Sequence, residues 1–289
     1  MEFKHLRNFV KIVEEGNITR AAQKLNMAQP PLSTQMQQLE TELNCILFQR
    51  GARNITLTDS GYLLYEKAKT ILTLAEQLPE EINGIGTAAS VLHMGIISSV
   101  SNYLPEAILP GFLRQHPNIR YQVYEKNTYQ LIEAIFSDMV DLAIVRTPFQ
   151  NTGLVCYPIR KNLMYAIGRQ QFFGHITADS IDLNDLWKYP LIIYRRWEDI
   201  LRKHSQADGV SPNLICINDD ARTTLHWAEA GLGVGIVPES IISYSRHDLL
   251  AKPISNPDLT SDIMLVHRKG KSLSLAAKAF VSYLQNNPM

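Results

Sequence analysis

The chain has 289 residues and a formal net charge of zero, and 45% of its residues are hydrophobic and 19% charged. This length suits about two or three structural units, and the composition is typical of a globular protein. No apolar run reaches the length of a membrane span, and residues 1–7 are polar without an apolar signal core. We therefore expect no membrane contact and a cytoplasmic location.

The cysteines and histidines show no grouped pattern. Cys45, Cys156 and Cys216 lie far apart and form no Cys-x-x-Cys pair, and none of the eight histidines has a partner at metal-ligand spacing. We expect reduced structural thiols, no metal site and no cofactor. A redox role for Cys156 or Cys216 stays open as an alternative.

Apolar residues at helical spacing predict three helices near the start of the chain. The first ends at Gly16, the second is capped by Asn17, and the third opens at Gln29-Pro30-Pro31, where early prolines are tolerated. Residues 46–58 then predict two short strands around a basic turn that contains glycine.

A long fourth helix is expected to begin at Thr58 or Asp59. Apolar residues recur in it at alternating spacings of four and three, which indicates a dimerisation seam: Leu64, Ala68, Ile71, Ala75 and Leu78. A face buried inside one unit would give the same pattern. Pro79 should end or kink this helix, and residues 83–90 have the small side chains of an interdomain hinge.

From residue 91 onward the predicted strands and helices alternate, as in a parallel sheet with right-handed crossovers. The first set has strands at 91–97, 119–125 and 141–145, with helices at 103–115 and 128–137. The second set has strands at 191–194, 213–217 and 234–237, with helices at 197–207 and 220–230. A strand at 261–267 and a helix at 273–285 follow. We expect two α/β lobes with a cleft between them.

Residues 18–37 carry the strongest functional signal, because two helices are separated by a short break and small Ala21 and Ala22 permit a close crossing. The second of these helices has no charged side chain from Gln29 to Leu39. Glutamines and hydroxyls at a helix start suit hydrogen bonds to base edges and phosphates in a DNA major groove. A polar face that is only solvated is the alternative. Residues 1–58 hold seven basic and five acidic side chains, so charge alone does not decide.

Several motifs, taken in order along the chain, resemble those of a known family. They are residues 18–33, Leu39-Glu40-x-Glu42-Leu43, Leu47-Phe48-x-Arg50, Leu57-Thr58-x-x-Gly61 and residues 231–238. This set is similar to that of the LysR-type transcriptional regulators. The resemblance covers essentially the whole chain and is most specific over residues 1–88.

The resemblance implies an α/β protein with an N-terminal winged helix-turn-helix and a long linker helix, followed by a two-lobed effector domain of the periplasmic-binding-protein-like (type 2) fold. The implied ranges are 1–58 for the DNA-binding domain, with its helix-turn-helix at 18–37, 59–90 for the linker or dimerisation helix and hinge, and 91–289 for the effector domain. Lobe I would comprise 91–161 and 267–289, and lobe II 162–266. The implied partners are double-stranded promoter DNA, a small-molecule effector, further copies of the chain in a homodimer or homotetramer, and RNA polymerase if the protein is an activator.

The same resemblance assigns DNA contacts to the third helix and to the wing. The expected residues are Gln29, Pro30, Ser33, Thr34, Gln35 and Gln38 on the helix, with Arg50 and Arg53 in the wing. Many members carry arginine at the position of Thr34, so one phosphate contact per subunit is expected to be missing or weaker here.

The expected effector site lies in the cleft, near strand carboxyl ends and helix N-termini. The candidate residues are Ser98, Ser99, Thr128, Arg146, Tyr194, Arg195 and Asp219. Helix-terminal amides beside an arginine suit an anion, and Tyr194 and Trp197 suggest an aromatic one, so we predict a small carboxylate. The alternatives are that the hydroxyls only cap helices and that Arg146 pairs with an acidic neighbour.

Other classes of protein fit the sequence less well. Residues 231–235 resemble a dinucleotide loop, but they follow a predicted helix and precede a strand, the reverse of the required order. No Gly-x-Ser-x-Gly, Walker or His-Glu-x-x-His motif is present, so nothing in the sequence indicates an enzyme. A free-standing cytosolic small-molecule-binding protein would leave the helix-turn-helix unexplained. A redox-responsive regulator without a metabolite effector is the remaining alternative.

Overall fold

The computed structural model describes residues 2–50, 55–84, 90–173, 176, 178–245 and 249–287. The chain forms two compact units, Met1–Thr87 and Ala88–Met289. No helix among the described residues is both long and apolar enough to cross a bilayer.

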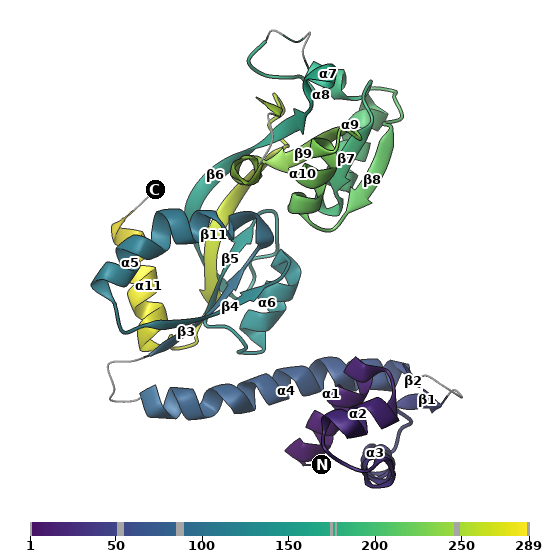
Figure 1. The fold of residues 1–289 in the computed structure, drawn as a ribbon. Coiled ribbons are helices and arrows are strands. Elements are labelled where there is room, and N and C mark those ends of the chain that lie inside the picture. Colours follow the sequence, from purple (N-terminus) through teal and green to yellow (C-terminus); the bar gives the residue numbers. More distant parts are fainter. Residues whose placement is uncertain are drawn as a thin grey trace. The chain divides into compact units, whose positions relative to one another are not determined.

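In its described residues the first unit contains four helices and a two-stranded antiparallel sheet, arranged as in Figure 1. In chain order its elements are α1 (Phe3–Glu15), α2 (Ile18–Lys24), α3 (Gln29–Leu43), β1 (Phe48–Arg50), β2 (Ile55–Leu57) and α4 (Asp59–Gly84). Gly16 ends α1 in the left-handed conformation with φ of 63°, and its N–H donates to the carbonyls of Ile12 and Val13. The Asn17 side chain accepts from Thr19 N at 2.8 Å and thereby caps α2. The predicted end of α1 and start of α2 are confirmed.

The long helix α4 packs against the core of its unit in its first half and is exposed near its end. Ala68 and Leu72 are buried against the core formed by the first three helices, whereas Leu78 and Ile82 are 54% and 57% exposed. The first half of the predicted seam therefore packs within its own unit, as the alternative interpretation allowed. The helix also continues through Pro79 to Gly84, so of the two expected outcomes an end at Pro79 is wrong, and a kink there stays a prediction. A proline removes a single N–H donor, and the surrounding helical residues retain theirs.

The second unit contains a nine-stranded sheet covered by helices (Figure 1). In chain order its elements are β3 (Val91–Ile96), η1 (Ser98–Val100), η2 (Leu104–Ile108), α5 (Leu109–Gln115), β4 (Arg120–Glu125), α6 (Thr128–Phe136), β5 (Leu142–Arg146), β6 (Leu154–Gly168), α7 (Gln170–Phe173), α8 (Leu183–Leu186), β7 (Leu191–Tyr194), η3 (Arg195–Trp197), α9 (Glu198–Ala207), β8 (Leu214–Asn218), α10 (Ala221–Glu229), β9 (Val234–Pro238), η4 (Glu239–Tyr244), β10 (Leu250–Pro253), β11 (Thr260–Arg268) and α11 (Leu275–Asn286).

Two parallel strand triplets are joined by two long antiparallel strands. The strand order is β4-β3-β5-β11-β6-β9-β7-β8, and β10 pairs with β6. The pairs β3–β4, β3–β5, β7–β8 and β7–β9 are parallel, which confirms the two predicted β-α-β sets. The strand β6 was not predicted; it pairs with β11, and the two run between the two halves of the unit (Figure 1).

Separate hydrophobic cores define two lobes in this unit. Lobe I comprises the elements from β3 to β5 together with α11, and its core includes Phe112 and Phe280. Lobe II comprises the elements from α7 to β10, and its main core includes Leu191 and Trp197. The long strands β6 and β11 contribute residues to both lobes, and they therefore set how the two lobes face each other.

Candidate functional site

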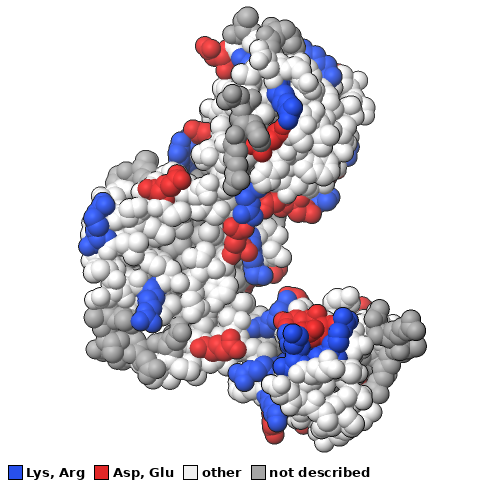
Figure 2. All heavy atoms as spheres, in the orientation of Figure 1, with Lys and Arg blue, Asp and Glu red and all other residues white. Residues whose placement is uncertain are grey.

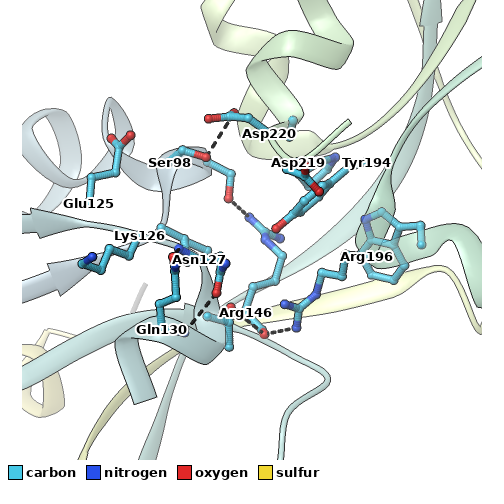
Figure 3. Close-up of a pocket in the computed structure, with 16 residues that line it drawn as sticks. Ser98, Glu125, Lys126, Asn127, Gln130, Arg146, Tyr194, Arg196, Asp219 and Asp220 are labelled. Carbon is cyan, nitrogen blue, oxygen red and sulfur yellow. Dashed lines mark hydrogen bonds between the residues drawn. The ribbon is translucent and has the colours of Figure 1, made fainter. Parts of the chain in front are cut away.

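A cavity of about 290 Å³ lies between the two lobes, at the carboxyl ends of the parallel strands (Figure 3). This is the edge at which open α/β sheets bind their ligands, because strand ends and helix N-termini converge there. The lining residues that carry polar groups are Ser98, Ser99, Glu125, Lys126, Asn127, Thr128, Gln130, Arg146, Tyr194, Arg196, Trp197, Asp219 and Asp220.

Arg146, the last residue of β5, is 3% exposed and is held by neutral acceptors only. Its Nη1 donates to Asn162 Oδ1 at 3.1 Å and to Ser261 Oγ at 2.7 Å. Its Nη2 donates to Ser99 Oγ at 3.2 Å and to Ser240 Oγ at 2.9 Å. Its Nε is buried and has no acceptor. Burial, followed by repulsion from nearby Arg196, lowers the pKa of Arg146 to about 9.

Arg196 lies beside Arg146 and is also held by neutral groups. Its Nη2 donates to the backbone carbonyls of Arg146 and Pro148, and its guanidinium lies 5.7 Å from the ring centroid of Tyr129. The Nε of Arg196 and the indole Nε1 of Trp197 are buried without an acceptor. Burial lowers the pKa of Arg196 as well. Within the described residues, neither arginine forms an ion pair with a carboxylate, and Asp262 acts on Arg146 only from beyond ion-pair distance.

The carboxylates of the pocket are engaged by other arginines. Asp219 accepts from Arg195 Nε at 2.7 Å. Asp220 and Glu125 accept from Arg222 Nη2 at 2.7 Å and 2.6 Å. These acidic groups are therefore compensated, whereas the two arginines of the floor are not. The floor of the pocket therefore offers buried N–H donors on two arginines that are in no ion pair within the part of the chain that the structure describes.

The hydroxyl groups of the pocket are not all helix caps. The cap of α6 is Asn127, whose Oδ1 accepts from Gln130 N at 3.0 Å, while Gln130 Oε1 accepts from Asn127 N at 3.4 Å. Thr128 is buried, and its Oγ1 lies 3.4 Å from the backbone N and O of Arg146. Thr128 therefore lies against the backbone that presents Arg146.

The exposed face of α3 is polar and uncharged. Leu32, Met36 and Leu39 pack into the core, and the opposite face turns to solvent. Gln29, Pro30, Thr34 and Gln38 are exposed and Ser33 is half-buried. The surface over α3 is largely white in Figure 2, without the Lys and Arg colour found elsewhere on this unit. Thr34 Oγ1 donates to the carbonyl of Pro30 at 3.1 Å, which leaves its lone pairs facing outward.

Gln35 differs from its neighbours on α3. It is half-buried, and its Oε1 accepts from Asn8 Nδ2 at 2.6 Å. Asn8, on α1, is 4% exposed. Gln37, which the list of expected contacts omitted, is exposed on the same face as Thr34. Its position three residues after Thr34 is the signal that could have included it.

The predicted wing is partly described. The strands β1 and β2 pair in antiparallel fashion as expected, from Phe48 opposite Leu57 to Arg50 opposite Ile55. The side chain of Arg50 and the whole of Arg53 lie outside the described residues.

Comparison with known proteins matches both units of the chain to one family. A model described as "Bacterial regulatory helix-turn-helix protein, lysR family" matches residues 3–62. A second, described as "LysR substrate binding domain", matches residues 86–288. The chain belongs to the LysR family. The resemblance noted in the sequence and the fold class that it implied are thereby confirmed.

Individual relatives within the LysR family cover nearly the whole chain. The HTH-type transcriptional regulator BenM of Acinetobacter baylyi is 29% identical over 93% of this chain and 90% of its own length. The probable cat1 operon transcriptional activator of Acinetobacter lwoffii is 30% identical over 94% of this chain and 91% of its own. The crystal structure of the LysR-family regulator CbnR has the same fold, with a TM-score of 0.82, 23% identity and complete coverage of both chains.

Most of the predicted effector residues of this LysR-family chain come together in one pocket. Ser98, Ser99, Thr128, Arg146, Tyr194 and Asp219 line it. Arg195 does not; its exposed side chain pairs with Asp219, and its neighbour Arg196 lines the pocket instead. Sequence reasoning also missed Asn162, Ser240 and Ser261, the acceptors of Arg146, because no local pattern marks them.

Proposed function

We propose that this LysR-family transcriptional regulator binds promoter DNA through α3 and the β1–β2 pair, and that a small carboxylate bound in the pocket between the lobes controls it. The observation that carries the effector class is the pair of arginines at the floor of the pocket. Arg146 is buried and Arg196 is half-buried, and neither has a carboxylate partner among the described residues. A bound anion would supply the missing charge and the acceptors for the unpaired N–H groups.

The size and lining of the pocket limit the ligand. A cavity of about 290 Å³ is at the small end of the range for ligand sites, which begins at about 300 Å³. Tyr129 and Tyr194 border the arginine floor, so a compact and partly apolar acid suits the space. Each acidic side chain of the pocket is held by an arginine, so none is available as a free base, and we propose no catalytic activity.

The DNA side of the proposal rests on the polar face of α3. Gln29, Thr34, Gln37 and Gln38 present amide and hydroxyl groups without charge, which suits hydrogen bonding to base edges. We assign residues 1–58 to DNA binding, 59–90 to the linker, and 91–289 to effector binding, with the lobes bounded as the sequence suggested. The exposed apolar residues Leu78 and Ile82 of α4 support pairing of two chains, as a homodimer or within a homotetramer. A DNA-binding regulator of this kind acts in the cytoplasm.

A redox mechanism is the second candidate, since the hydrogen peroxide-inducible genes activator of Haemophilus influenzae is 26% identical to this chain. Burial raises the pKa of the Cys156 thiol, which lowers its thiolate fraction and its reactivity. Cys216 Sγ accepts from Asn218 Nδ2 at 3.9 Å. The raised pKa of Cys156 favours the metabolite effector over oxidation of that thiol.

A matched pair of ligands tests the effector class. Benzoate and benzamide have similar shapes, but only benzoate is charged. We expect benzoate to raise the melting temperature of the full-length protein in a dose-dependent way and benzamide to leave it unchanged. Sulfate and 2-oxoglutarate extend the panel to other anions. Failure of every anion to stabilise the protein would contradict the effector class.

Binding to DNA is tested separately by fluorescence anisotropy. The labelled duplexes are the promoter of the protein's own gene and a random sequence of equal length, at physiological salt. We expect tighter binding to the promoter, and a change in that preference when an effective anion is added. Equal affinity for both duplexes in all conditions would refute the proposal.

A further inference from the structure

An ionic clasp bridges the two lobes at the pocket. Arg222, at the start of α10 in lobe II, donates from Nη2 to Glu125 Oε1 at 2.6 Å, and Glu125 ends β4 in lobe I. The same Nη2 donates to Asp220 Oδ2 at 2.7 Å. Asp220 in turn accepts from Ser98 Oγ of lobe I at 3.2 Å. Glu125, Asp220 and Ser98 all line the pocket (Figure 3).

Part of this clasp is local structure, and part is not. Asp220 caps α10 by accepting from Arg222 N at 2.8 Å, so the pair Asp220–Arg222 stabilises the start of the helix within lobe II. The hydrogen bonds from Arg222 outweigh the opposing effect of burial and hold the pKa of Asp220 below its usual value. The contact with Glu125 contributes nothing to α10, because Glu125 belongs to the other lobe. Its effect is to join the lobes.

The clasp is open to solvent, and its strength therefore depends on salt. The side chains of Arg222, Glu125 and Asp220 are 33%, 37% and 30% exposed. Charged side chains of both signs gather where the two lobes meet (Figure 2). Exposed ion pairs weaken as salt screens them.

A second bridge between the lobes is uncharged. Tyr244 of lobe II places its hydroxyl 2.9 Å from Ser101 Oγ, accepts from Asn102 N at 2.7 Å and donates to the carbonyl of Ser98 at 3.1 Å. Neutral hydrogen bonds respond little to salt, so salt separates the contribution of the clasp from that of Tyr244.

We propose that Arg222 is a positioning residue for the effector: by clasping Glu125 and Asp220 it holds the lobes in the closed arrangement in which Arg146 and Arg196 line one pocket. The proposal deepens the proposed function, since it rests on the pocket being the effector site. In this arrangement both arginines face the same cavity. The fraction of closed molecules then sets the apparent affinity, because binding is reduced in proportion to the population of the competent state. Arg222 thus controls affinity without contacting the ligand.

Hydrogen exchange of the ligand-free, full-length protein tests the clasp directly. Arg222→Gln removes the charge, and Arg222→Lys restores it in part. The control is Arg202→Gln, which removes an arginine that pairs with Glu198 at 2.9 Å within the single helix α9. The readout is deuterium uptake by peptides that cover residues 98–102 and 194–197, which lie on the two sides of the pocket. Circular dichroism checks that each variant is folded.

We expect Arg222→Gln to exchange about fivefold faster than the wild type in both peptides at low salt, the effect of losing an exposed ion-pair contact. The exchange rate of Arg222→Lys should lie between those of the wild type and Arg222→Gln, and the rate of Arg202→Gln should match that of the wild type. Raising NaCl to half-molar should bring the wild type close to the rate of Arg222→Gln and change that variant less, since the exposed pair Arg160–Glu239, at 3.0 Å between β6 and η4, is still present in it. If both peptides of Arg222→Gln take up deuterium at the wild-type rate at low salt, the proposal is overturned.

Benzoate titration then separates this proposal from the effector class. If the clasp positions the effector, Arg222→Gln raises the Kd for benzoate about fivefold, in line with the lost population of the closed state. Equal Kd values in Arg222→Gln and wild type overturn the positioning role. If benzoate and the other anions stabilise no variant, the effector class fails, and the exchange rates alone decide whether the clasp closes the lobes.

Discussion

Replacement of Arg146 by methionine would separate the cost of burying a charge from the benefit of that charge in binding. Methionine is unbranched and uncharged, so it occupies the space of the aliphatic stem of Arg146 and cannot ionise. The pKa of Arg146 is lowered by burial from 12.5 to about 9, which corresponds to about 5 kcal/mol at about 1.4 kcal/mol per unit. Because the lowered value belongs to a base, the cost is fully present below pH 9 and declines only as pH rises from 9 towards 12.5.

The four hydrogen bonds of this guanidinium oppose that cost. Bonds from a charged donor contribute about 1.5 kcal/mol each at the low end, or about 6 kcal/mol for four. The two quantities nearly cancel, so Arg146→Met should change the stability of the ligand-free protein by no more than about 2 kcal/mol at pH 7.5. An arginine kept only for stability would give a larger loss.

The response to the anion should change much more than the stability. A ligand at one hundred times its Kd stabilises a protein by about 2.7 kcal/mol, or about 5–10 °C for a domain near 200 residues. We expect this shift with benzoate in wild-type protein and none in Arg146→Met, measured by thermal denaturation at pH 7.5. Arg202→Met, a change of an exposed arginine on α9, is the control. A dose-dependent shift of wild-type size in Arg146→Met would refute the role of the buried charge.

Three further predictions concern the DNA-binding unit. Gln29→Ala should lower discrimination between promoter and random duplex by about 1–3 kcal/mol with little change in the salt dependence of binding, as titrations of affinity against salt would show. Asn8→Leu removes the 2.6 Å hydrogen bond to Gln35, and it should weaken promoter binding while leaving the melting temperature within a few degrees, since an apolar residue suits that buried position. Gly61→Ala would place a Cβ 2.2 Å from the carbonyl oxygen of Leu47, and the resulting clash should lower the stability of this unit by about 1–3 kcal/mol in urea denaturation.

The sequence predicted most regular elements because their signals are local. Helix caps at Gly16 and Asn17 and the parallel strand sets follow from short-range patterns. The strand β6 was not predicted from the sequence, because it contains Pro158 and a register shift in its pairing with β11. It therefore lacks the regular alternation of a strand. Its existence depends on β11, about a hundred residues further along the chain.

The site was predicted to the extent that strand ends mark it. Arg146 follows directly from its place at the end of β5, and Ser98 and Thr128 follow from the ends of β3 and β4. The sequence predicted Arg195 in the pocket, whereas the structure places Arg196 there. Both residues lie in the short helix η3, where no periodicity specifies which side chain faces inward. That Arg146 and Arg196 have no carboxylate within ion-pair distance in the described part of the chain could be seen only in three dimensions.

The contacts of Arg146 would link the proposed ligand binding to the geometry of the two lobes. Its guanidinium donates to Ser99 of lobe I, to Ser240 of lobe II, and to Asn162 and Ser261 on the two strands that join the lobes. An anion that binds this guanidinium competes with those four neutral acceptors, and a charged acceptor forms the stronger bond. Each bond that the anion displaces frees a different part of the junction between the lobes. In the proposed function, the side chain that recognises the ligand also donates to one residue on each of the strands β6 and β11, so we expect occupancy of the pocket to alter the restraints on both lobes.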